Sequence, residues 1–204
     1  MSKVPDVSVI LPFADHEDVI GTAVRRLSAH LRELGLAFEL IAVDEDSGDN
    51  SHAVLALLRP DFPELHISNA PGRGRGIGCG ARRARGKALW VIEPTVAAAS
   101  PLAPFGRAHR RVARGERELV AVGARFIIGH RTRCLPVIDG MRGTGWSFQR
   151  KLARRAQSRG LAVEHQVVGG ARRARTPGER RLSRLLGALA PARFSPLRAE
   201  RNLW

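Results

Sequence analysis

The chain of 204 residues is long enough for one domain with a substantial core, and 44% of its residues are hydrophobic. No apolar run is long enough to cross a membrane without a charge, and the first residues lack the pattern of a cleaved signal peptide. Two cysteines without a CxxC pair argue against a disulfide framework and against a cysteine zinc site. The expected location is therefore the reducing cytoplasm.

The net charge of +15 is unevenly distributed along the chain. Residues 1–70 carry 5 basic and 12 acidic side chains, residues 71–140 carry 14 and 4, and residues 141–204 carry 15 and 3. A protein that coats nucleic acid would be basic throughout, whereas this layout predicts a surface that attracts a polyanion on one side only. The charge alone is compatible with nucleic acid, a nucleotide diphosphate, an anionic membrane or a lipid phosphate.

Strands and helices are predicted to alternate in the first half of the chain. Apolar residues recur every three or four positions from Ile20 to Leu34, which predicts an amphipathic helix ended by Gly35, and a short helix is predicted to end near Leu58. A continuous apolar, β-branched run predicts a buried strand at Val7–Phe13, and further strands are predicted at Phe38–Val43, Leu65–Ser68 and Ala88–Ile92. This order predicts an α/β domain with a mainly parallel sheet flanked by helices.

The second half continues the pattern up to about residue 169, where the composition turns to Arg, Gly, Ala and Pro. The predicted elements are helices at Phe105–Ala113 and Trp146–Arg159 and strands at Leu119–Phe126 and Ala162–Val168. We therefore expect one domain over residues 1–168 and a basic, partly helical extension over 169–204. Leucines between 182 and 189 oppose arginines, so this segment could lie on an anionic membrane surface or pack on the domain.

Two segments of the first half carry candidate binding residues. An acidic turn begins at Asp44, directly after the second strand, where ligands of open α/β sheets bind. Its carboxylates could accept hydrogen bonds from a base or a ribose, or they could cap the next helix. A glycine-rich segment from Pro71 to Gly86 holds Arg73 and Arg75 between glycines, which permit close approach to phosphates. The alternative is a flexible arginine-rich loop.

In order and spacing, these segments resemble the nucleotide-sugar half of family 2 glycosyltransferases with the GT-A fold. The polyprenyl-phosphate transferases typified by dolichyl-phosphate-mannose synthase are the most similar group. The matching motifs are a PxYNE-like opening at 12–16, VDDGSxD at 43–49, a GKG loop with its following glycines at 72–86, VGSRF at 122–126, FQxE at 148–151 and a terminal RxxGxSK at 175–181. The resemblance covers about residues 6–182 and implies a single GT-A-like nucleotide-diphospho-sugar transferase domain.

The resemblance also implies the site and its ligands. It places a UDP- or GDP-linked sugar against Pro12, Phe13, Asp15, Asp44, Glu45, Arg73 and Glu93, and the acceptor or its phosphate against Arg175 and Arg181. The acceptor would be a polyprenyl phosphate, which implies a peripheral position on the inner face of the membrane, or a glycan. No catalytic base is assigned, because a lipid phosphate with a second pKa near ~6 is largely dianionic at neutral pH.

The departures from the family pattern concern its chemistry. The DxD motif that binds Mg²⁺ or Mn²⁺ in the family reads Glu93-Pro94-Thr95 here, so Glu93 alone remains as a metal ligand. The Tyr and Glu of the opening motif are Ala14 and His16, and the Glu of FQxE is Lys151.

Three functions stay open. The first is a glycosyltransferase with atypical or absent metal dependence, in which arginines of the glycine-rich segment meet the diphosphate charge. The second is a catalytically degenerate relative that binds nucleotide or acts as a scaffold. The third, a nucleic-acid-binding module, rests on charge alone, and 5% aromatic residues give it little capacity to stack bases.

Overall fold

The computed structural model describes residues 4–123, 126–143 and 145–166. Its strands are β1 (Val7–Phe13), β2 (Phe38–Asp44), β3 (Leu65–Asn69), β4 (Ala88–Ile92), β5 (Leu119–Val122), β6 (Phe126–His130) and β7 (Val163–Gln166). Its helices are α1 (Ile20–Glu33), α2 (Ser51–Leu58), a 3-10 turn at Arg59–Asp61, α3 (Gly76–Arg83), α4 (Pro94–Ala99), α5 (Ala103–Ala113), α6 (Arg131–Ile138) and α7 (Gly145–Gln157). No helix of the described ranges is long and apolar enough to cross a membrane.

The seven strands form one sheet in the order β3-β2-β1-β4-β6-β5-β7. The first four are parallel neighbours, β6 runs antiparallel to both β4 and β5, and β7 is parallel to β5. Only β6 is therefore reversed in this sheet. The predicted α/β domain with a mainly parallel sheet is confirmed.

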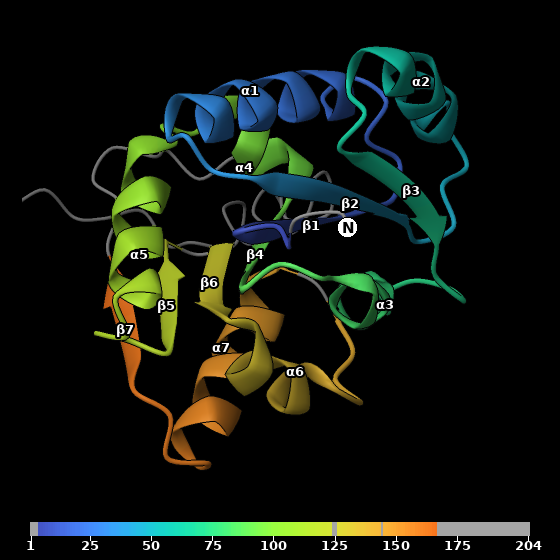
Figure 1. Ribbon diagram of the computed structural model, residues 1–204. Helices are drawn as coiled ribbons and strands as arrows, with labels where there is room; N and C mark the ends of the chain where they lie inside the picture. Colours follow the sequence, from blue (N-terminus) through green and yellow to red (C-terminus); the bar gives the residue numbers. More distant parts are fainter. Residues whose placement is uncertain (1–3, 124–125, 144, 167–204) are drawn as a thin grey trace, which may run out of the picture. The chain divides into compact units, whose positions relative to one another are not determined.

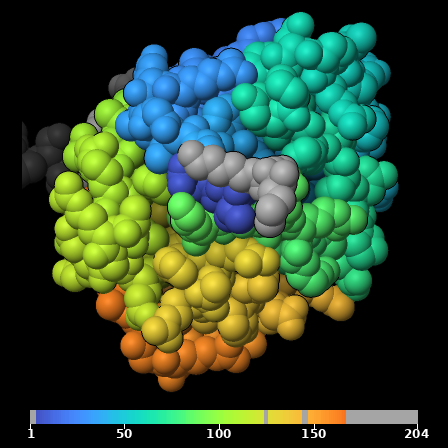
Figure 2. Space-filling model, in the orientation of Figure 1, coloured from blue at the N-terminus to red at the C-terminus, as the bar shows by residue number. Residues whose placement is uncertain are grey.

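Helices cover both faces of the sheet, which makes three layers (Figure 1). α1, α2, α4 and α5 share one apolar cluster with the sheet, and α3, α6 and α7 share the other. The space-filling view shows the blue and teal layer of α1 and α2 on one side and the yellow and orange layer of α6 and α7 on the opposite side (Figure 2).

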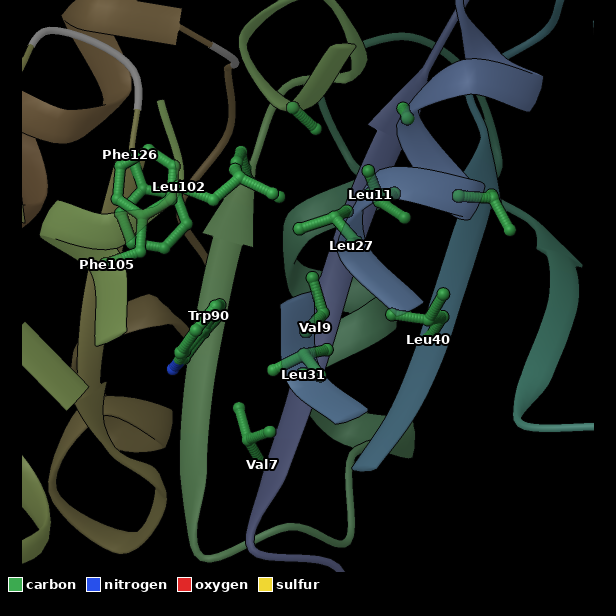
Figure 3. Packing of buried hydrophobic residues seen from close by; sticks show 14 of the residues in the cluster. Val7, Val9, Leu11, Leu27, Leu31, Leu40, Trp90, Leu102, Phe105 and Phe126 are labelled. Carbon is green, nitrogen blue, oxygen red and sulfur yellow. The ribbon is translucent and has the colours of Figure 1, made fainter. Parts of the chain in front are cut away.

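The double cover explains why the central strands read as largely apolar runs. All seven residues of β1 are buried, because alternate side chains enter the two clusters. Val7, Val9 and Leu11 point toward Leu27 and Leu31 of α1 (Figure 3). The periodic stripe predicted for α1 is its buried face, and the helix ends before Gly35, whose φ of +67° suits a glycine.

Several parts of the chain differ from the sequence prediction. The single strand predicted over Leu119–Phe126 is wrong, because Gly123, at φ +62°, follows β5 and a separate antiparallel strand begins at Phe126. Apolar residues continue on both sides of this turn, so hydrophobicity does not mark it. Three further helices were not predicted from the sequence: α3, which lies within the glycine-rich segment, α4 and α6. The predicted extension over 169–204 lies outside the described residues.

Candidate functional site

The carboxyl ends of the parallel strands bring the predicted acidic residues to one edge of the sheet. Phe13, Asp44 and Asn69 are register partners at the ends of β1, β2 and β3. β4 is parallel to β1, and Glu93 directly follows its last residue. Asp44 and Glu93 therefore share this edge, where ligands of open α/β sheets bind.

Asp44 is held in a fixed orientation at this edge. It is 8% exposed, and its Oδ1 accepts hydrogen bonds from the Ser47 backbone N–H at 2.9 Å and from the Ser47 hydroxyl at 2.7 Å. Asp46, within the same turn, has a left-handed backbone with a φ of +72°. Within the part of the chain that the structure describes, no hydrogen bond reaches the second oxygen, Oδ2. That oxygen can therefore accept a hydrogen bond from a ligand.

Glu45 turns inward to the beginning of α3. The side chain is 4% exposed, and its Oε1 accepts the Gly76 backbone N–H at 2.6 Å. A Cβ on Gly76 would lie 2.7 Å from this oxygen, so only glycine leaves room for the contact. A carboxylate is favourable here because the first N–H groups of a helix carry partial positive charge. Glu45, predicted to bind the nucleotide, thus positions α3 in this structure.

Arg73 is paired with Asp15. Its Nη2 lies 2.6 Å from Oδ2 of Asp15, while Oδ1 of Asp15 accepts the Gly48 N–H at 2.7 Å. The pKa of Asp15 is lowered, first by the Gly48 hydrogen bond and then by Arg73, and Asp15 in turn raises the pKa of Arg73. The ion pair links the loops after β1, β2 and β3. A phosphate that approaches Arg73 therefore competes with a carboxylate.

Asp49, later in the acidic turn, holds the chain before α2 through hydrogen bonds. Oδ2 of Asp49 accepts the Glu17 N–H and Oδ1 accepts the Ser51 N–H, both at 2.9 Å. Glu17 accepts the Asn50 N–H at 3.0 Å in return. Burial raises the pKa of Asp49, but the hydrogen bonds from Ser51 and Glu17 outweigh it and hold the pKa below its usual value. These carboxylates organise the chain that enters α2.

The side chains of Pro12 and Phe13 are buried in β1. Phe13 is 1% exposed and belongs to the apolar cluster under α1. Its carbonyl accepts the Glu45 N–H at 2.8 Å. The side chains of the two residues predicted to line the donor site are therefore buried, and the Phe13 backbone contacts the acidic turn. Arg175 and Arg181, predicted at the acceptor, lie outside the described residues.

The residues after β4 do not fit the divalent-metal site that the resemblance implies. α4 begins at Pro94, directly after Glu93, because proline suits the first position of a helix. The Thr95 hydroxyl is buried without a hydrogen-bond partner, and a threonine supplies no charge at the position of the second carboxylate. Across the described ranges, no group of three His, Cys, Asp or Glu side chains is arranged to hold a metal ion.

Sequence reasoning missed the roles of two residues on the face covered by α3, α6 and α7. Gln149 is buried, and its amide donates to the carbonyls of Gly123 at 3.1 Å and Phe126 at 2.9 Å, which holds the turn between β5 and β6. Arg142 lines a pocket beside α3, together with residues near position 75. The signal available in the sequence was its position between two glycines, Gly140 and Gly143, which have a left-handed φ in the structure.

Comparisons with known proteins agree with this architecture. No family model matches the chain. The succinoglycan biosynthesis protein ExoO of Rhizobium meliloti (strain 1021) is 32% identical over 99 residues, which are 47% of this chain. The chain spans 28% of the length of that curated relative.

Solved structures resemble the chain over most of its length. The mannosyltransferase PcManGT from Pyrobaculum calidifontis, in complex with GDP-Man and Mn²⁺, has a TM-score of 0.65 and 14% identity, over 96% of this chain and 67% of that one. Glucosyl-3-phosphoglycerate synthase from Mycobacterium tuberculosis, with Mn²⁺, UDP and phosphoglyceric acid, has a TM-score of 0.65 and 18% identity, over 90% and 76%. The fold is the GT-A glycosyltransferase fold.

Proposed function

We propose that the chain binds a UDP- or GDP-linked sugar and transfers the sugar to an acceptor such as a lipid phosphate or a glycan. The observation that carries the proposal is the shared edge of Asp44 and Glu93 in a sheet with the GT-A fold. Structures with this fold include complexes with GDP-Man and with UDP-glucose. Membership of family 2, a polyprenyl-phosphate acceptor and a cytoplasmic position at the inner face of the membrane are parts of the same proposal.

In this proposal Asp44 recognises the nucleoside. Its Oδ2 accepts a hydrogen bond from a base imide or a ribose hydroxyl, while Ser47 keeps the carboxylate in place through Oδ1. The diphosphate needs positive charge, and the glycine-rich segment supplies arginines where the family uses a metal ion. Transfer would then proceed with little or no dependence on Mn²⁺.

One observation favours a second function, a catalytically degenerate nucleotide-binding or scaffold protein. Glu93-Pro94-Thr95 retains one carboxylate, and the described residues do not fit a divalent-metal site. A chain of this kind would bind a nucleoside diphosphate, or nothing, without turnover.

Calorimetric titration with UDP and GDP tests the donor site. Replacing Asp44 with Ala should weaken binding by about 1–3 kcal/mol, the usual cost of removing one partner of a charge-assisted hydrogen bond. Asp61→Ala is the matched control, because this exposed carboxylate precedes β3, at the opposite edge of the sheet. Affinity unchanged by Asp44→Ala would remove Asp44 from the site.

The metal and the turnover are tested in the same preparation. Nucleoside diphosphate affinity should be nearly the same with Mn²⁺ and with EDTA. It should fall with added salt, because dissolved ions screen the attraction between the arginines and the diphosphate. Release of UDP or GDP from a sugar donor in EDTA supports the transferase, and binding without release supports the degenerate relative. Tight binding that requires Mn²⁺ would contradict the reasoning about Glu93.

A further inference from the structure

A pocket of about 210 Å³ lies between α3 and the segment that follows α6. Helices α3 and α6 lie side by side on the same face of the sheet (Figure 1). The residues that line the pocket are Pro71, Arg75, Gly78, Cys79, Arg82, Gly140, Met141 and Arg142. The lining therefore combines small and apolar residues with three arginines from two segments of the chain.

Glycines allow the two segments to approach. The Gly143 N–H donates to the Gly74 carbonyl at 2.8 Å, and a Cβ on Gly74 would lie 3.1 Å from the Gly143 nitrogen. Both residues have φ in the left-handed region, at +76° for Gly74 and +115° for Gly143. This close backbone contact joins the loop before α3 to the loop that carries Arg142, and Arg75 and Arg142 both line the pocket.

The charge of the pocket is strongly positive. Of the described residues that line it, none carries a carboxylate. Asp139 lies nearby, with its Oδ1 at 3.6 Å from Nη1 of Arg82, and both side chains are well exposed to solvent. Nη2 of Arg82 also lies 3.5 Å from the Cys79 sulfur. Three arginines that line one small volume give it a positive potential, which a bound anion would neutralise.

We propose that this pocket binds a phosphate group. Guanidinium groups bind phosphate through two parallel hydrogen bonds, and the volume is below the ~300–1,000 Å³ of sites that enclose a whole small molecule. The pocket therefore takes a phosphate while the rest of the ligand extends outside it. Phosphate recognition then belongs to Arg75, Arg82 and Arg142, and not to Arg73, which Asp15 holds.

The phosphate has two sources, the diphosphate of the sugar donor or a phosphorylated acceptor. The identification of either source rests on the proposed function, whereas the binding of a phosphate in the pocket does not. Both sources share the same chemistry at the pocket. Inorganic phosphate and pyrophosphate are therefore the probes, and nucleoside diphosphates distinguish the sources.

Isothermal titration of the full chain at low ionic strength tests the pocket. Arg142→Gln and Arg75→Gln should each weaken pyrophosphate binding by about tenfold, because each removes a charge-assisted hydrogen bond. Arg83→Gln is the matched control, since Arg83 is an exposed residue of α3 outside the lining set. An unchanged thermal midpoint shows that each variant is folded. If wild-type protein binds neither probe, or if Arg83→Gln weakens binding equally, the proposal is wrong.

Competition assigns the source. Displacement of pyrophosphate by UDP or GDP places the donor diphosphate in the pocket, and simultaneous binding places an acceptor phosphate there. If UDP and GDP do not bind at all while pyrophosphate still requires Arg142, the phosphate pocket stands and the proposed function fails. The two proposals can therefore fail separately.

Discussion

Replacing Gly80 with Ala should test how α3 packs on the sheet. A Cβ at this position would lie 2.5 Å from Cγ2 of Ile10 and 3.3 Å from Cγ2 of Val43. Both are buried side chains of central strands, so neither can move into open space. Overpacking of this kind costs about 1–3 kcal/mol, and alanine recovers about 0.5–1 kcal/mol of helix propensity. We expect a net loss of roughly 1–2 kcal/mol in the free energy of unfolding.

Gly78→Ala is the matched control on the same helix. Its Cβ would meet only Nη1 of Arg82, at an ordinary 3.6 Å, so the variant should gain about 0.5–1 kcal/mol from helix propensity. Urea denaturation gives the free energy of unfolding of both variants. Their difference reports the overpacking alone, because both variants gain the same helix propensity. If Gly80→Ala is as stable as Gly78→Ala, α3 does not pack on β1 and β2 as described.

Two further predictions concern buried titratable groups. Glu45→Gln keeps an acceptor for the Gly76 N–H and should cost about 0.3–1 kcal/mol of stability, whereas Glu45→Ala leaves the N–H unpaired and should cost about 1–3 kcal/mol, as measured by chemical denaturation. Burial, assisted by Arg110, lowers the pKa of His109, whose Nδ1 accepts the Trp90 indole N–H at 3.2 Å. The unfolded chain then binds the proton more readily, so stability should decline as pH falls below ~6.5, by at most about 1.4 kcal/mol per pH unit. His109→Gln should remove this part of the slope in denaturation curves between about pH 5 and 7, and a wild-type slope in the variant would refute the assignment.

Helices and strands whose burial produces a local hydrophobic pattern could be predicted from the sequence. β1 and β4 are buried on both faces, so every residue in them is apolar or small, and the runs are unbroken. The stripe of α1 corresponds to its buried residues because one helix face meets one layer. The order of these elements then places Asp44 and Glu93 at one edge without further information.

The partners of the charged side chains could not be predicted in the same way. Asp15 and Arg73 are 58 residues apart, and Glu45 and Gly76 are 31 apart. Composition identified carboxylates and arginines near a binding edge, but any carboxylate can accept from a ligand, an arginine or a backbone N–H. The three-dimensional path of the loops decides between them. The phosphate pocket is a further case, since Arg142 comes from a loop that no motif links to α3.

The uneven charge of the chain acquires a physical explanation from these contacts. Three carboxylates of the acidic first third are engaged at the loops: Asp49 accepts from backbone N–H groups before α2, Glu45 accepts from the first N–H of α3, and Asp15 pairs with Arg73. Their negative charge is therefore compensated within the protein. Among the arginines that line the pocket, Arg82 lies near Asp139, and this exposed pair is screened by solvent. In the proposed pocket, a ligand phosphate would be neutralised by this positive charge and not by a metal ion. Phosphate binding therefore does not need a second carboxylate beside Glu93.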